Sequence, residues 1–187
     1  MTQDSQATYY HAWAAILAAF VDACRQPSTT TLERLTQAID ELIKLGARVR
    51  LPYYYSLLAR AYLKAEATDR AEAALDQALA ASQQQGEHWW DAELHRLRGE
   101  IELARGTDCA TVEAAYGQAI AVAQAQQAKS LELRAATSLA RLWQQQGKQA
   151  QAYRLLSAIH GWFTEGFDTP DLVAAQELLT DLSPQSS

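Results

Sequence analysis

Eleven side chains fall at helical spacing in three stretches of the sequence, and their charges point to binding chemistry. Positions three, four or seven residues apart share one face of a helix. The set holds six basic groups, counting one histidine, and one acid, although the chain has a net charge of −6. Its members are Tyr53, Ser56, Arg60, Lys64, His95, Arg98, Glu102, Arg134, Thr137, Arg141 and Gln144. A basic stripe of this kind attracts a carboxylate terminus, a phosphorylated ligand or an acidic segment.

A plainer interpretation of these basic groups stays open at this stage. Glu93, Glu100 and Glu132 lie near several of the arginines in sequence, so ion pairs within or between helices could neutralise the stripe. Exposed ion pairs of this kind contribute little to stability, but they would leave less charge for a partner.

The remaining reactive side chains form no recognisable catalytic or metal-binding pattern. The histidines at positions 11, 88, 95 and 160 do not share a helix face with a carboxylate in metal-ligand spacing, and the sequence lacks a G-x-x-x-x-G-K-[ST] loop. Cys24 and Cys109 are far apart and fall in helical patterns, so we expect buried, reduced thiols. We therefore expect no enzymatic activity, no metal and no cofactor.

The composition predicts that helices position these side chains. Ala, Leu and Gln are abundant, whereas the chain has only 8 Gly and 4 Pro in 187 residues. Gly46, Gly86, Gly106, Gly147 and Gly166 each follow an amphipathic stretch, where a C-terminal cap is expected. The predicted helices span residues 7–25, 30–45, 51–66, 69–85, 88–105, 108–127, 129–146, 148–164 and 170–182.

Pairs of these helices repeat one pattern of large and small apolar residues. In the third pair, Leu94, Leu97 and Ile101 are followed by Val112, Tyr116 and Ala119; equivalent sets begin at Tyr55 and Ala136, and a degenerate one begins at Trp13. In the fourth pair, Leu133, Ala136 and Ala140 fit nearly as well. The layout resembles the tetratricopeptide repeat (TPR), in which small residues on the second helix allow close approach of the first. The alternative is a helical bundle without repeats.

Three further segments carry a more specific resemblance. They are Ala92–Glu100, Lys129–Trp143 and Gly161–Leu172, and together they resemble the C-terminal TPR region of large bacterial signalling proteins. In that family a class III adenylate/guanylate cyclase or transcriptional-regulator module is joined to a predicted ATPase. The resemblance implies an all-α solenoid of about four TPR-like helix pairs plus a C-terminal capping helix. It also implies a regulatory or scaffold role, without naming a ligand.

These patterns favour a module that holds a protein or peptide partner in a concave, partly basic groove. A small-molecule effector sensor is the first alternative. Self-association through helix 7–25 is the second, because no earlier repeat covers Trp13, Ile16, Leu17 and Phe20. The acidic chain argues against nucleic acid as a partner.

Aromatic residues stand out at two places. Trp162, Phe163 and Phe167 are expected to form a structural cap that seals the end of the solenoid beneath helix 170–182. Trp89 and Trp90 begin helix 88–105, and adjacent helical positions point about 100° apart. We therefore expect one of these tryptophans in the core and the other partly exposed as a candidate interface anchor.

The ends and apolar runs of the sequence indicate a cytoplasmic protein. Residues 1–6 are polar with no basic leader, and we expect residues 1–6 and 183–187 to be disordered around one domain at 7–182. The longest apolar run, residues 12–21, is shorter than the ~20 residues that span a bilayer, so no membrane partner is expected.

Overall fold

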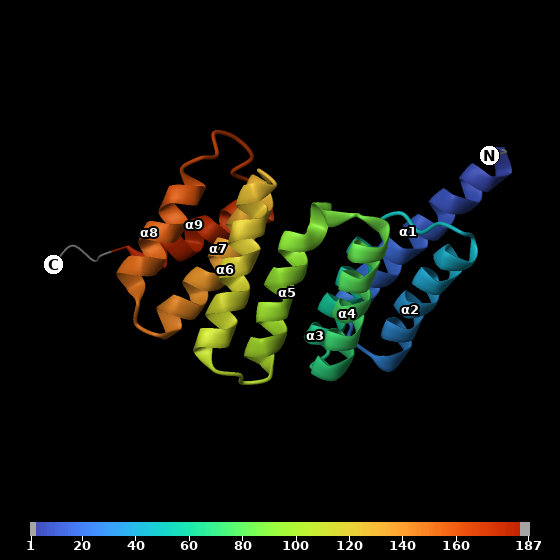
Figure 1. Cartoon of the computed structure of the whole chain (residues 1–187), viewed down its shortest axis with the longest axis horizontal. Coiled ribbons are helices and arrows are strands. Elements are labelled where there is room, and N and C mark those ends of the chain that lie inside the picture. Colours follow the sequence, from blue (N-terminus) through green and yellow to red (C-terminus); the bar gives the residue numbers. More distant parts are fainter. Residues whose placement is uncertain (1–2, 184–187) are drawn as a thin grey trace. The chain divides into compact units, whose positions relative to one another are not determined.

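The computed structural model describes the backbone of residues 3–183 and the side chains of residues 8–183, and all of its regular structure is helical. The described chain folds into nine α-helices and one short 3₁₀ helix (Figure 1). They are α1 (Gln3–Arg25), α2 (Thr29–Lys44), α3 (Leu51–Lys64), α4 (Thr68–Gln85), η1 (His88–Trp90), α5 (Asp91–Ala104), α6 (Cys109–Ala125), α7 (Lys129–Gln145), α8 (Gln149–His160) and α9 (Pro170–Leu182). The predicted all-α class is confirmed.

The helix ends agree closely with the sequence-based bounds, with two differences. α1 begins at Gln3, so residues 3–6 are helical where we predicted a disordered tail; residues 1–2 and 184–187 of the predicted tails lie outside the described residues. The predicted helix 88–105 is divided into a 3₁₀ turn and α5. None of the helices in the described chain combines the length and apolar character that crossing a bilayer requires.

Local sequence explains where several helices begin and end. Ser28 caps α2 by accepting a hydrogen bond from the Thr31 amide, and Asp108 caps α6 by accepting one from the Thr111 amide at 3.0 Å. Pro52 and Pro170 occupy first-turn positions, where the missing amide proton is not needed. Gly86 ends α4 with φ +67°, a left-handed conformation that costs glycine little.

The chain divides into two compact units, Met1–Trp90 and Asp91–Ser187. In the first unit α1 packs on α2 and α3 packs on α4, while both α1 and α2 contact α3. On α4, the second helix of the pair that begins at Tyr55, two small residues and one large one are fully buried: Ala71, Leu75 and Ala78 are each 0% exposed. The prediction of a single domain over residues 7–182 stays a prediction.

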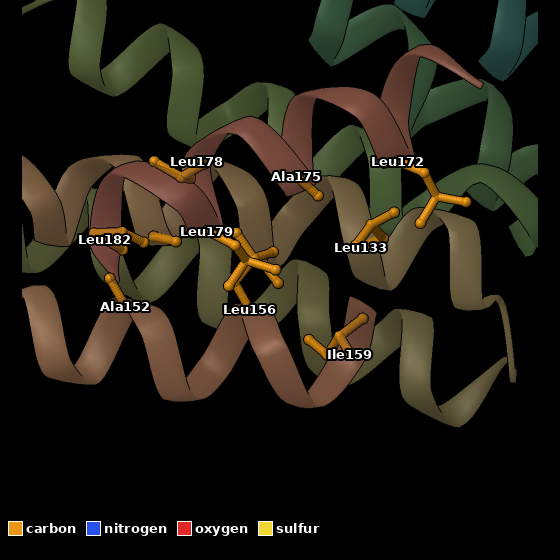
Figure 2. Close-up of a cluster of buried hydrophobic side chains, with 11 residues drawn as sticks. Leu133, Ala152, Leu156, Ile159, Leu172, Ala175, Leu178, Leu179 and Leu182 are labelled. Carbon is orange, nitrogen blue, oxygen red and sulfur yellow. The ribbon is translucent and has the colours of Figure 1, made fainter. Parts of the chain in front are cut away.

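In the second unit α7 packs on α5, α6, α8 and α9. One face of α7 contributes Leu133, Ala136 and Ala140 to a core that also holds Leu156 and Ile159 of α8 and Leu172 of α9 (Figure 2). Another face contributes Leu139 and Leu142 to a cluster with Val112 and Tyr116 of α6. Leu133 and Ala140 of one predicted register and Leu139 of the other are therefore buried on two faces of α7, whereas Trp143 is half-buried and packs against both clusters.

A polar network lies beside this core. Arg96 on α5 donates hydrogen bonds to Glu93 and, at 2.8 Å, to Glu100. The Glu93 side chain is only 1% exposed. Arg96 also donates to Ser138 of α7 at 3.2 Å. Glu93 and Glu100 therefore pair with Arg96, which is not one of the predicted groove residues.

Candidate interaction surface

Three of the predicted binding residues lie on one face of α3. Tyr53, Arg60 and Lys64 are separated by seven and then four residues, so they point within about 40° of one another and span about 16 Å. Arg60 and Lys64 are exposed, and Tyr53 is half-buried. We call these three residues, with Trp89 that packs on Tyr53, the α3 surface.

Arg60, one of the two cations of the α3 surface, is oriented by an aromatic ring and not by an acidic side chain of the described residues. The Arg60 guanidinium lies 5.5 Å from the ring centroid of Phe20 on α1, which orients it by a cation–π interaction. Burial raises the pKa of the Cys24 thiol on α1, and the nearby charges of Arg60 and Lys64 oppose that rise. Neither Arg60 nor Lys64 forms an ion pair with a described residue, so both charges remain available to a ligand.

An aromatic cluster forms the other end of the α3 surface. The Tyr53 ring lies 5.2 Å from Trp90, 6.1 Å from Trp89 and 5.6 Å from Tyr54, measured between centroids. Trp89 is 46% exposed, as predicted for one of the pair, whereas Trp90 is half-buried and does not lie in the core. Both indoles nevertheless contact Tyr53, because the two residues belong to a 3₁₀ turn.

The prediction that Ser56 lines a binding groove is wrong. Ser56 is 1% exposed, so it does not line a groove. Its hydroxyl accepts a hydrogen bond from Trp90 Nε1 at 2.9 Å and donates one to the Tyr53 carbonyl oxygen at 2.6 Å. Ser56 therefore fixes the Trp90 indole against α3, which keeps the aromatic cluster ordered.

An open pocket of about 460 Å³ lies beside the lysine end of the α3 surface. Lys64, Arg70 and Glu66 line it together with Ser28 at the start of α2. Arg70 was absent from the predicted set; its guanidinium lies 5.9 Å from the Tyr62 ring centroid. Its place in the first turn of α4 gave no sequence signal, because only the fold brings α2 and α4 together here.

The predicted residues of α5 are all half-buried. Glu102 accepts a hydrogen bond from the Thr107 hydroxyl at 2.8 Å, so part of its carboxylate is used within the chain. Burial lowers the pKa of His95, and the neighbouring Arg98 lowers it further while Asp91 opposes the shift. Near neutral pH His95 therefore adds little positive charge.

The predicted residues of α7 are divided between core and surface. Arg134 Nε lies 2.6 Å from Asp171 Oδ2 of α9, an ion pair that offsets its charge. The predicted binding role is also wrong for Thr137, which is only 6% exposed and donates a hydrogen bond to the Leu133 carbonyl oxygen. Arg141 is exposed and Gln144 is half-buried. The sequence could not reveal Asp171 as a partner, since it lies 37 residues from Arg134.

The predicted aromatic cap is wrong for two of its three residues. Phe163 packs against the core of α7, α8 and α9, but Trp162 is 59% and Phe167 is 51% exposed. The segment between α8 and α9 consists of turns and bends, and only Phe163 of the three rings reaches the core.

The two cysteines lie on different helices, Cys24 on α1 and Cys109 at the start of α6. Cys109 is exposed and Cys24 half-buried, which corrects the expectation of two buried thiols. Among the described residues, no group of three or more His, Cys, Asp or Glu side chains is arranged to hold a metal ion.

No protein-family model matches this chain, and none of the curated proteins matches it.

Proposed function

We propose that the chain is a protein-interaction module whose α3 surface binds an acidic polypeptide segment. The observation that carries the proposal is the pairing of two exposed cations, Arg60 and Lys64, with an ordered aromatic cluster on the same helix face. In this role the module binds a partner segment or a sister domain rather than catalysing a reaction.

The chemistry of the α3 surface defines the ligand. Arg60 can present two parallel N–H donors to a carboxylate, whereas Lys64 acts as a compact charge. Trp89 and Tyr53 offer flat apolar area to an aliphatic or aromatic side chain. An extended peptide rises about 3.3 Å per residue, so the ~16 Å span of this surface accommodates about five residues.

The direct test is fluorescence anisotropy with a labelled acidic peptide that carries one apolar anchor. A matched peptide with Glu and Asp replaced by Gln and Asn supplies the ligand control. Arg60→Glu plus Lys64→Glu should abolish capture while helicity stays unchanged. Lys44→Glu plus Arg154→Glu makes the same change in net charge at exposed positions on α2 and α8 and should leave capture intact. Equal binding by both double variants would reject the proposal.

The wider setting is also part of the proposal. We propose that the helix pairs form a TPR-like solenoid that serves as a regulatory domain of a bacterial, cytoplasmic signalling protein. Support comes from the third helix pair, in which the pattern is buried: Leu94, Leu97 and Ile101 on α5, then Val112 and Tyr116 on α6, are each at most 1% exposed. The signalling role is inferred from the three segments that resemble TPR regions joined to cyclase and ATPase modules. Small-angle scattering that fits a closed bundle would argue against a solenoid.

A second candidate function follows from the open pocket beside Lys64. Its volume of about 460 Å³ suits a small effector, and Lys64 and Arg70 favour an anionic one. Inorganic phosphate and nucleotides are suitable probes in a thermal-shift assay. A ligand at about 100 times its Kd adds about 2.7 kcal/mol, so a real effector gives a clear shift. A shift that survives Lys64→Ala plus Arg70→Ala would exclude this pocket as its site.

Self-association through helix 7–25 is the remaining alternative. On α1, Tyr10 is 59% and Val21 is 42% exposed, so the helix presents apolar area. Tyr10→Ser plus Val21→Ser should then lower the mass measured by light scattering.

A further inference from the structure

The C-terminal end of the chain carries acidic groups and no Lys or Arg. After Arg154, the sequence contains Glu165, Asp168, Asp171, Glu177 and Asp181 and no further Lys or Arg. Asp171 is held by Arg134, whereas the other four are exposed. The segment between α8 and α9, residues 161–169, holds the first two of them.

The same segment presents two large aromatic side chains outward. Trp162 and Phe167 are both more than half exposed. Trp162 is ordered by an edge contact with Phe163 at 5.2 Å and by Lys129, whose Nζ lies 5.8 Å from the indole centroid. Glu132 pairs with Lys129 at 2.7 Å and offsets its charge. The 161–169 segment is thus an ordered, acidic and aromatic projection.

We propose that the 161–169 segment of one molecule docks on the α3 surface of a second copy of the same chain. This inference rests on the proposed function and names its acidic partner. The two surfaces are complementary in charge, since exposed Glu165 and Asp168 meet exposed Arg60 and Lys64. Both surfaces also carry aromatic side chains, since Trp162 would pack on the aromatic cluster around Tyr53 and Trp89.

The order of groups along the two surfaces fits one docking register. On α3 the cations lie seven and eleven residues beyond Tyr53, at about 10 and 16 Å along the helix. In the segment the acids lie three and six residues beyond Trp162, which the chain can extend over at most about 10 and 20 Å. These extended lengths are upper limits, because turns shorten the segment. With Trp162 on the aromatic cluster, Glu165 therefore comes nearest to Arg60 and Asp168 nearest to Lys64.

Such a contact joins two different surfaces, so an open assembly keeps one free α3 surface at one end and one free segment at the other, unless a ring closes. Assembly should depend on protein concentration and should weaken as salt screens the charges. If the segment docked within its own chain, the measured mass would stay that of a monomer at every protein concentration. A mass measurement therefore distinguishes docking within one chain from docking between two molecules.

The test is light scattering coupled to size exclusion, with the protein at up to about 0.2 mM, where micromolar contacts are populated. In about 0.05 M salt the wild-type mass should rise with concentration above the monomer value of 20.7 kDa, and in about 0.5 M salt it should return to it. Arg60→Glu plus Lys64→Glu should give a monomer, and so should Glu165→Lys plus Asp168→Lys. Trp162→Ala plus Phe167→Ala should do the same.

Charge exchange makes the result specific to this contact. An equimolar mixture of the two charge-reversed proteins restores one opposite-charge pair and keeps the native pair available, so assembly should return. Glu33→Lys plus Asp40→Lys on α2 is the control reversal, and it should assemble like the wild type. Far-ultraviolet circular dichroism and thermal midpoints verify folding, since all of these side chains are exposed.

The outcomes separate this inference from the proposed function. A wild-type monomer at every concentration, or a mixture that fails to assemble, overturns the inference. If such a monomer still captures the acidic peptide through Arg60 and Lys64, the proposed function survives alone. If neither peptide nor second copy depends on these two residues, both are rejected.

Discussion

Gly99 on α5 lies directly against the Tyr116 ring of α6, and its substitution gives a sharp test of the packing. A Cβ at Gly99 would collide with Tyr116 Cε1 and would lie 2.6 Å from Cδ1 and 3.0 Å from Cζ. Tyr116 is 1% exposed and packs with Leu139 and Leu142, so its ring has little room to move. Overpacking at this severity costs about 3 kcal/mol, the upper end of the usual range.

The helix itself responds in the opposite sense. Replacing Gly by Ala inside a helix stabilises it by about 1 kcal/mol. The net prediction for Gly99→Ala is therefore a loss of about 2 kcal/mol in the free energy of unfolding. Gly117 on α6 is the matched control, because it is exposed and a Cβ there meets nothing within 4 Å. Gly117→Ala should gain about 1 kcal/mol.

Urea unfolding followed by circular dichroism measures both variants. A second comparison isolates the contact: Gly99→Ala should cost less in a Tyr116→Leu background, because the ring that it meets is gone. If Gly99→Ala is as stable as Gly117→Ala, the close approach of α5 and α6 is not as described.

Other predictions concern the second unit. Arg96→Met leaves the buried Glu93 carboxylate unpaired and should cost about 3–5 kcal/mol, with a smaller loss when Glu93→Gln is added; equal losses would contradict the network. The pKa of His95 is lowered in the folded protein, so the histidine binds a proton more readily in the unfolded chain. The free energy of unfolding should therefore fall as the pH drops below about 6.5. His95→Gln should make this decline smaller when urea unfolding is measured over a range of pH. Leu97→Ala and Leu139→Ala should each cost about 2–5 kcal/mol in urea unfolding, and neutral results at both would refute the repeated pattern.

The sequence predicted the helices well because its signals are local. Gly86 and Asp108 mark helix ends through their own backbone and side-chain preferences. The periodic apolar residues of α5 and α6 lie in the core because a helix places them on one stripe. Two registers fitted α7, since that helix is covered on several sides by α5, α6, α8 and α9.

The binding set was harder to predict, because exposure depends on neighbours far away in sequence. Ser56 and Thr137 share the helical period of the arginines, but Trp90 covers the first and the second donates its hydroxyl proton back to Leu133. The charge of Arg134 is offset by Asp171 across 37 residues. Periodicity identifies a face of a helix, whereas its partners are set by packing.

The aromatic residues show the same limit. Trp162, Phe163 and Phe167 read as a cap because large apolar side chains are usually buried. The turns after Gly161 place only Phe163 against the core, and this geometry has no simple sequence signature. Trp89 and Trp90 both reach Tyr53 because a 3₁₀ turn replaces the predicted helical start.

Nuclear magnetic resonance of the five tryptophan indoles, during titration with the labelled acidic peptide, reports directly on binding at the α3 surface. Binding there should move the Trp89 and Trp90 signals and leave the Trp143 signal in place, and Arg60→Glu plus Lys64→Glu should abolish the movement. Movement that persists in that variant, or unchanged Trp89 and Trp90 signals at saturating peptide, would contradict binding at the α3 surface.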